Sequence, residues 1–414
     1  NKDGWDDIYV SNDFLEPDVL YINQQNGTFK NEINSRMKHI SFNSMGSDLA
    51  DLNNDLLPDL MTLDMLAENY ARGKENMASM STQNFLSMVE VGYHHAYMAN
   101  MLHIDNGNGT FNETGQMSGV VKTDWSWAPL IADYDNDGNK DIYITNGVIK
   151  DYTNQDFRVA INKRGKQGAI TLQEVLDMMP AEKLSNYMYK NSGEQSFEKV
   201  IDSWGLNDPS FSNGAAYADF DNDGDLDIVT NNINSDVGLY KNNGSQNYLQ
   251  IKLKGPASNL NGLGSKIFVI NPDMNQLKEQ FTARGFLSSI TNVVHFGLGK
   301  NKLAQQVIVQ WPDKKVSELN DVKANQIITV DYATATSKNV ALQHFRLTKK
   351  NLNVGIIGVN FIHQENQFDD YSVQLLLPQK QSTKGTGIVT GDVNGDGLDD
   401  FFVGNALGAA AALY

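Results

Sequence analysis

A nine-residue acidic pattern recurs along the chain and limits the possible folds more than any other feature. Its clearest copy, "DYDNDGNKD", places Asp133, Asp135, Asp137 and Asp141 at positions 1, 3, 5 and 9, with a glycine at position 6. Unpaired, four carboxylates this close together repel one another and disfavour a compact turn. The pattern therefore predicts either a loose, solvated loop or a loop that holds a cation.

Calcium is the cation that such a loop favours, because Ca²⁺ accepts about six to eight oxygen ligands in flexible geometry whereas Mg²⁺ needs a stricter octahedron. The backbone carbonyl of Asn139, at position 7, is a further candidate ligand. An EF-hand would need glutamate at position 12, where this chain has Ile144 within the apolar alternation "IYITN". We interpret the segment as a calcium loop that leads into a β-strand.

Four further copies of the pattern predict the same kind of loop, and solvated aspartate turns stay the alternative interpretation. Their predicted ligands are Asn1, Asp3 and Asp7; Asp51, Asn53, Asp55 and Asp59; Asp219, Asp221, Asp223 and Asp227; and Asp392, Asn394, Asp396 and Asp400. Because Leu56 stands where the glycine belongs, we expect the second loop to be distorted. The first copy lacks its first ligand, so we expect its site to be open. Because the chain begins inside this repeat and stops fourteen residues after the fifth loop, we also expect it to be part of a longer protein.

Apolar segments with glycine-containing centres follow four of the loops and predict β-hairpins. They span Leu20–Phe29, Leu102–Phe111, Tyr187–Phe197 and Leu239–Ser245. A loop, a strand and a hairpin together make one small antiparallel sheet that cannot bury its faces alone. A row of such sheets is typical of a β-propeller.

Insertions are expected because the loops are spaced more widely than the about 40 to 60 residues of one four-stranded blade. We predict helical insertions near residues 67–100 and 150–190. The first carries apolar residues at helical spacing, namely Phe85, Val89, Tyr93 and Tyr97. The second contains a capping box, formed by Thr171 and Glu174, that predicts a helix start.

Residues 246–333 contain no acidic loop and have the pattern of β-strands throughout. Apolar and polar residues alternate over Leu249–Leu253, and "VIVQWPDKK" predicts a strand, a turn and a return strand. We expect a separate β domain without bound metal and with Trp311 and Phe296 in its core. Its ten basic and six acidic residues, in a chain of net charge −17, predict docking onto the acidic repeats, with an anionic ligand as the alternative.

These features together resemble the FG-GAP (VCBS) repeat proteins that carry an ASPIC/UnbV domain, in particular the bacterial, cartilage acidic protein-like type. The segments "DWSWAPLIADYDNDGNKDIYITNG", "NGLGSKIFVI" and "VVHFGLG" carry the resemblance. It implies a mainly β chain with FG-GAP β-propeller blades over 1–245 and a small ASPIC/UnbV β domain over 246–333. Residues 334–414 then resemble the start of a second FG-GAP propeller.

Composition excludes several classes of protein. The net charge of −17 argues against non-specific binding of nucleic acid, which requires a basic surface. The chain has no cysteine, which excludes disulfides and thiolate chemistry. No run of about eighteen apolar residues occurs, so the sequence predicts no transmembrane segment.

Known catalytic motifs are also absent from the sequence, including the Gly-x-Ser-x-Gly elbow, His-Glu-x-x-His and phosphate-binding glycine loops. Asp64 and Glu68 could form an acid pair, but a solvated helix start is the favoured interpretation. For His94 and His95 we favour an ordinary surface or packing role over a role as ligands. We therefore predict that the chain is not an enzyme.

The predicted function is calcium-dependent binding outside the cell or in the bacterial cell envelope, as an adhesion module that captures a glycan or protein ligand. The resemblance implies such a role without identifying the ligand. A glycan-active or other hydrolytic enzyme, with the helical insertions as a lid, is the alternative. Converging carboxylates of raised pKa in a pocket away from the loops would favour the enzyme, and exposed aromatic residues there would favour binding.

Overall fold

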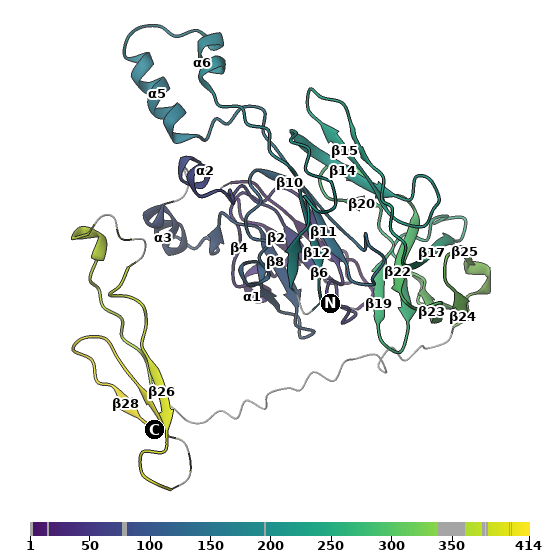
Figure 1. The fold of residues 1–414 in the computed structure, drawn as a ribbon. Helices are drawn as coiled ribbons and strands as arrows, with labels where there is room; N and C mark the ends of the chain where they lie inside the picture. The colour runs from purple at the N-terminus through teal and green to yellow at the C-terminus, as the bar shows by residue number, and fades with distance from the viewer. Residues whose placement is uncertain are drawn as a thin grey trace. The chain divides into compact units, whose positions relative to one another are not determined.

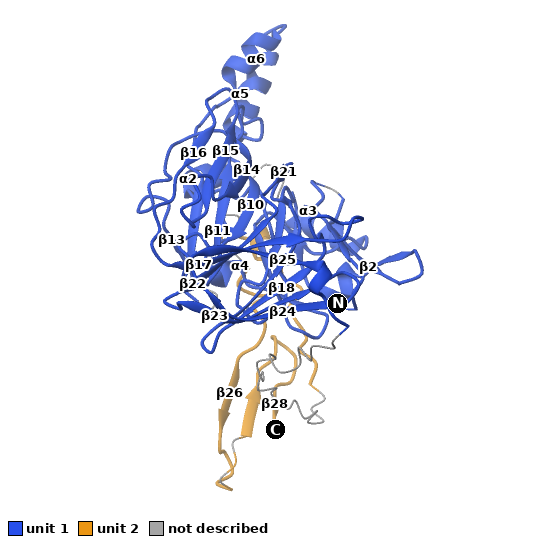
Figure 2. Ribbon diagram, turned by 90° about the vertical axis from the view of Figure 1, so that its right-hand side faces the viewer, with its two compact units in different colours: residues 1–347 blue, residues 348–414 orange. Residues whose placement is uncertain are grey.

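The computed structural model describes residues 3–14, 16–76, 81–193, 196–337, 361–374, 377, 380–396, 398 and 400–414. The chain divides into two compact units, residues 1–347 and 348–414, which are coloured separately in Figure 2. The chain as a whole is mainly β, as the sequence predicts. The two units are described below one at a time.

Four antiparallel sheets follow one another along the first unit, each with its strands in chain order (Figure 1). They are β1 (Ile8–Val10), β2 (Val19–Asn23) and β3 (Phe29–Asn31); β5 (Ser47–Ala50), β6 (Asp59–Thr62), β8 (Met101–Asp105) and β9 (Phe111–Glu113); β10 (Ser126–Ala132), β11 (Asp141–Asn146), β12 (Tyr187–Asn191) and β13 (Phe197–Lys199); and β14 (Ser212–Ala218), β15 (Asp227–Asn232) and β16 (Gly238–Tyr240). In the last three sheets the acidic loop joins the first strand to the second. The ninth position of each loop is therefore the first residue of a strand.

Each inner sheet contributes side chains to two cores, because successive residues of a strand point to opposite faces. In β11, Ile142 and Ile144 lie in the core shared with the second sheet, whereas Tyr143 lies in the core shared with the fourth. In β6, Leu60 packs toward the first sheet and Met61 toward the third. The sheets therefore stack face to face in chain order, as the blades of a propeller do.

Three of the four predicted hairpins are confirmed, at β2–β3, β8–β9 and β12–β13. The fourth, over Leu239–Ser245, is wrong. There β16 pairs with β15, and the chain then continues into β17 (Asn247–Lys254), which pairs with strands of the following domain. The physical reason is that β17 buries Leu249, Ile251 and Leu253 in that domain's core, so it cannot also complete the fourth sheet.

Short helices fill the predicted insertions: α2 (Tyr70–Glu75), α3 (Thr82–Glu90), α5 (Gln155–Gly165) and α6 (Leu172–Met178). The predicted capping box of α6 is present. The helical spacing in the first insertion extends too far, since α3 ends at Glu90 while Tyr97 belongs to β7 (Ala96–Tyr97), which pairs with β4 (Ile40–Ser41). Two single-turn helices are α1 (Ile33–Arg36) and α4 (Gly115–Ser118). No helix in the described ranges is long and apolar enough to cross a membrane.

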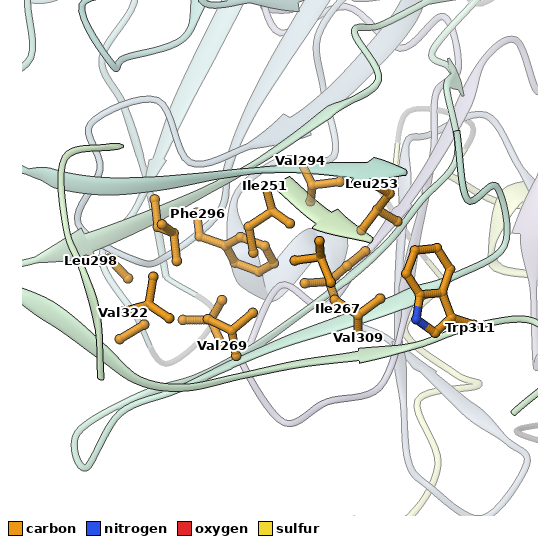
Figure 3. Packing of buried hydrophobic residues seen from close by; sticks show 14 residues of the cluster. Ile251, Leu253, Ile267, Val269, Val294, Phe296, Leu298, Val309, Trp311 and Val322 are labelled. Atoms are coloured by element: carbon orange, nitrogen blue, oxygen red, sulfur yellow. The ribbon is translucent and has the colours of Figure 1, made fainter. Parts of the chain in front are cut away.

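Residues 246–333 form two packed sheets. One has the order β22 (Val293–Gly299), β17, β25 (Gln326–Asp331), and the other β19 (Asn275–Glu279), β18 (Lys266–Ile270), β23 (Leu303–Gln310), β24 (Val316–Lys323). Their facing side chains make a hydrophobic core (Figure 3). It includes Phe296 and Trp311, as predicted, and the Trp311 indole donates to Ser317 Oγ at 3.0 Å. A short pair, β20 (Ala283–Arg284) and β21 (Ser288–Ser289), lies between β19 and β22 in the sequence.

The described residues of the second unit include one three-stranded sheet, made of β26 (Ile388–Gly391), β27 (Asp400–Val403) and β28 (Ala412–Leu413). Its acidic loop again joins the first strand to the second. The local pattern matches one repeat, and a second propeller stays a prediction.

A second core joins the repeats to residues 246–333, so that domain is not independent of them. Leu56, from the second acidic loop, packs with five apolar side chains of the domain, namely Phe268, Ile270, Leu277, Ile308 and Val316. Leu56 has φ +66°, the left-handed conformation that glycine would have supplied. The turn therefore keeps the conformation of a glycine turn, because burial of the leucine side chain offsets a backbone strain of about 1 kcal/mol. A distorted cation site in this loop stays a prediction.

Replacing Leu56 with glycine should lower the free energy of unfolding by about 2–4 kcal/mol, because the loss of apolar burial exceeds the relief of strain. Urea unfolding of the full chain measures this change. Lys314→Gly is the matched control, since Lys314 also has positive φ (+70°) but is exposed. It should leave stability within about 1 kcal/mol of wild type, and a stabilised Leu56→Gly variant would contradict the burial argument.

Candidate metal centres in the acidic loops

Three acidic loops share one backbone turn. The first aspartate accepts, through Oδ2, the N–H of position 6: Asp51 from Leu56 at 3.1 Å, Asp133 from Gly138 at 2.8 Å and Asp219 from Gly224 at 3.0 Å. The asparagine at position 4 has φ of +55°, +60° and +61° in the three loops. The predicted similarity of the Asp133 and Asp219 loops is therefore visible in matching hydrogen bonds and dihedral angles.

Two of these loops gather carboxylates closely enough to hold a metal ion. Asp133, Asp135 and Asp141 each offer an oxygen, and the three oxygens lie within 4.8 Å of one another. Asp219, Asp221 and Asp223 do the same in the next sheet. The prediction named four carboxylates in each loop, and each of these groups contains three of its four.

The Asp133 loop has a buried oxygen that a cation would satisfy. Asp133 is fully buried, and its Oδ1 has no hydrogen-bond partner among the described residues. Burial raises the pKa of Asp133 to about 7; the positive charge of Lys278 opposes this shift, and the carboxylates of Asp137 and Asp135 add to it. An ionised carboxylate at this depth needs compensating positive charge. The all-oxygen donor set fits a hard divalent cation.

Lysine side chains approach the same carboxylates. Lys190 Nζ contacts Asp135 and lies 3.2 Å from Asp137 Oδ2. In the next sheet Lys241 contacts Asp221 and lies 3.3 Å from Asp223 Oδ2. The sequence contains a pattern that could have predicted Lys190 and Lys241. Both lie in a "YKN" segment at the same strand position, where the earlier repeats have "YIN" and "HID".

The aspartates at position 9 fasten each loop to its sheet. Asp141 accepts the N–H of Tyr134 through Oδ2 at 3.0 Å and the N–H of Asn191, on the third strand, through Oδ1 at 2.9 Å. Asp59 and Asp227 make the same two bonds in their own repeats. Sequence analysis assigned position 9 to metal binding alone and missed this structural role.

The remaining predicted ligands lie in comparable turns. Asn53 and Asp55 of the second loop are held by local hydrogen bonds between side chain and backbone. In the last loop Asp392 and Asn394 both accept the N–H of Asp396, and Asp400 accepts the N–H of Val393 at 3.0 Å. In the first copy Asp7 accepts the N–H of Asn23, and Asp3 that of Trp5. Asn1 lies outside the described residues, so its open site stays a prediction.

Buried side chains from other parts of the chain surround the loops, and sequence reasoning missed them. Lys140 is fully buried and donates to Asn54 Oδ1 at 2.8 Å. His295 is buried, and burial followed by the charge of Lys278 lowers its pKa well below the usual value. The neutral ring therefore donates its Nε2–H to Asn136 Oδ1 at 2.5 Å. No local motif announces these contacts, because they join residues far apart in the sequence.

The other candidates have structural roles. Asp64 is buried and accepts from Ser41 Oγ at 2.5 Å and from two backbone N–H groups, so the predicted solvated helix start is wrong for it. Glu68 accepts from Lys199 Nζ at 2.6 Å and from the Tyr187 hydroxyl. The ring of His94 contacts that of His95, which in turn contacts Phe85, as packing residues do.

Stacked meander sheets, three of them with an acidic loop before an inner strand, define a blade-type β-repeat protein joined to a small β domain. Family models agree with this class: the FG-GAP-like repeat matches residues 1–62, 90–144 and 176–230, and ASPIC and UnbV matches residues 255–337. The chain belongs to the FG-GAP repeat proteins with an ASPIC/UnbV domain. No curated protein matches the sequence.

Replacing Asp141 with asparagine should lower stability by about 1–3 kcal/mol even without calcium, because an amide cannot accept both backbone N–H groups. Thermal unfolding of the full chain in excess chelator measures this effect. Asp137→Asn is the control, since Asp137 accepts a local backbone N–H from Asn139 and is partly exposed. Equal melting temperatures for the two variants would show that position 9 has no fastening role.

Proposed function

We propose that this chain is a calcium-binding protein whose acidic loops are loaded outside the cell. The observation that carries the proposal is the Asp133 loop, where three carboxylates converge and the buried Oδ1 of Asp133 has no other partner in the described structure. Asp133, Asp135 and Asp141 would hold the ion, with the Asp137 carboxylate and the Asn139 carbonyl as further candidates. The ion would neutralise the buried carboxylates and lock the turn.

Extracellular or cell-envelope localisation follows from the expected strength of binding. Calcium sites of extracellular modules bind at about 10⁻⁴ to 10⁻³ M, which suits external calcium and is poorly matched to the cytosol. The family matches agree with this setting, since FG-GAP repeats are typical of extracellular or envelope proteins.

We propose further that the protein binds a glycan or protein ligand and is not an enzyme. Two buried carboxylates of raised pKa lie outside the loops in the described part of the chain, and the charge of Asp64 adds to the rise at Asp18, but neighbouring hydroxyls occupy both: Asp18 accepts from Tyr9 and Ser44, and Asp64 accepts from Ser41. A cavity of 220 Å³ adjoins Asp137, beside an acidic loop. These features support binding over hydrolysis.

The two insertions offer an exposed aromatic surface. They meet at Arg72, which pairs with Asp151 at 3.1 Å and with Asp124 at 2.6 Å. Close to this junction, Tyr70 is 79% exposed and Tyr152 is 56% exposed. Exposed aromatic rings on a fixed support are suited to stacking on sugar rings or apolar side chains, so we propose this surface as the ligand contact.

Calcium should raise the melting temperature of the full chain, and excess chelator should lower it, because the cation binds only the folded loops. Asp137→Asn and Asp223→Asn should each reduce this calcium-dependent shift. Asp313→Asn, in the domain without acidic loops, should not. Identical wild-type melting curves in calcium and in chelator would overturn the calcium proposal and the argument for export.

Tyr70→Ala and Tyr152→Ala should each weaken ligand binding about tenfold, given the free energy that one buried aromatic contact contributes. The measurement is retention of the labelled full chain on glycan and extracellular-protein arrays in calcium. Leu172→Ala is the control, because Leu172 is 73% exposed on α6. Release of reducing sugar from a bound glycan would favour the hydrolytic alternative instead.

A further inference from the structure

Successive acidic loops are joined by the asparagine at position 4. Asn54 donates from Nδ2 to the carbonyl of Gly138 in the next loop at 3.1 Å. Asn136 repeats the contact one sheet further on, donating to the carbonyl of Gly224 at 3.1 Å. Each acceptor directly precedes position 7, whose carbonyl is a candidate ligand. A direct hydrogen bond therefore connects each of these loops to the next.

The ASPIC/UnbV domain contacts the same loops through polar atoms. His295 donates to Asn136 Oδ1, and the N–H of Gly299 donates to the Asn136 carbonyl at 2.8 Å. Gln250 donates from Nε2 to Asp219 Oδ2, one of the gathered carboxylate groups, at 2.7 Å. The domain thus donates hydrogen bonds both to Asn136, which connects two loops, and to Asp219, a candidate ligand.

The backbones also approach each other closely at this contact. A Cβ atom at Gly297 would collide with Asp133 Oδ2 and lie 2.6 Å from Asn136 Cα. The side chain of Tyr248 covers Gly224 so closely that a Cβ there would overlap its ring. Only glycine fits at Gly297 of the domain and at Gly224 of the loop, so the loops and the domain are in close contact at both places.

We propose that calcium binding to the Asp133 and Asp219 loops is coupled to docking of the ASPIC/UnbV domain, with Asn136 and Gln250 as positioning residues. The inference rests on the proposed calcium function. Coupling is reciprocal: if docking holds the loops in the shape that binds calcium, calcium must strengthen docking by the same factor. The domain would then raise the calcium affinity of the loops by fixing their shape, although it supplies no ligand itself.

Asn136→Gly tests the coupling without removing any carboxylate. Glycine keeps the left-handed backbone at position 4, where the last acidic loop itself has Gly395 at φ +80°. Asn222→Gly is the matched control, because Asn222 occupies the same position at φ +61° but is exposed. On the domain side, Gln250→Ala is paired with Lys252→Ala, an exposed residue of the same strand.

Calorimetric titration of the full chain with calcium chloride should show binding about tenfold weaker in Asn136→Gly and Gln250→Ala than in wild type, given the loss of buried hydrogen bonds. The two controls should match wild type. Hydrogen exchange gives the reciprocal reading: calcium should slow exchange in β17 and β22 of wild type, and less so in the two test variants.

The outcomes separate this inference from the proposed function. Absence of calcium binding by wild type would overturn both. Calcium binding with the same affinity in wild type, Asn136→Gly and Gln250→Ala, and with unchanged exchange in β17 and β22, would overturn the coupling alone. If Asn136→Gly fails to fold, Gln250→Ala still decides the matter, since its side chain contacts the loop from the other domain.

Discussion

Buried negative charge is the constraint on which the rest of the structure depends. Asp133 is fully buried next to Asp135 and Asp137, and a carboxylate in that position is ionised only if positive charge compensates it. Lys140, which is fully buried, and Lys278, which is half-buried, interact favourably with Asp133, but burial lowers the pKa of both amines, that of Lys278 to about 7. The orphaned oxygen of Asp133 shows where a cation would complete the compensation.

The loops also organise the sheets, because their position-9 aspartates accept backbone N–H groups from two different strands or turns. Asp141 joins its own loop to β12 in this way, and Asp59 and Asp227 do the same in their repeats. Charged groups and hydrogen bonds therefore stabilise the loop end of each sheet, while alternating apolar side chains stabilise its packed faces. A single short motif specifies both a candidate cation site and the start of the inner strand.

Docking of residues 246–333 combines apolar and polar contacts at the same loops. Leu56 enters an apolar core of the domain, although its backbone conformation would suit glycine better. Nearby, Arg284 pairs with buried Asp48 at 2.7 Å, which matches the opposite charges of the two parts. The domain has a core of its own. Its contact with the repeats also excludes solvent from the loops, and the loop residues on that side are therefore buried.

The sequence by itself determined the mainly β class, the repeats, the insertions and most of the acidic loops, because these depend on neighbours within about ten residues. Glycine, asparagine and aspartate at fixed spacing define the turns, and the alternation after each turn defines a strand. Tertiary structure alone decided which strand leaves the fourth sheet, why Leu56 tolerates positive φ, and how Gln250 and His295 reach the loops. Those outcomes join residues far apart in the sequence, 159 positions in the case of His295 and Asn136, and their free energies come from burial and hydrogen bonds that exist only once the domains pack.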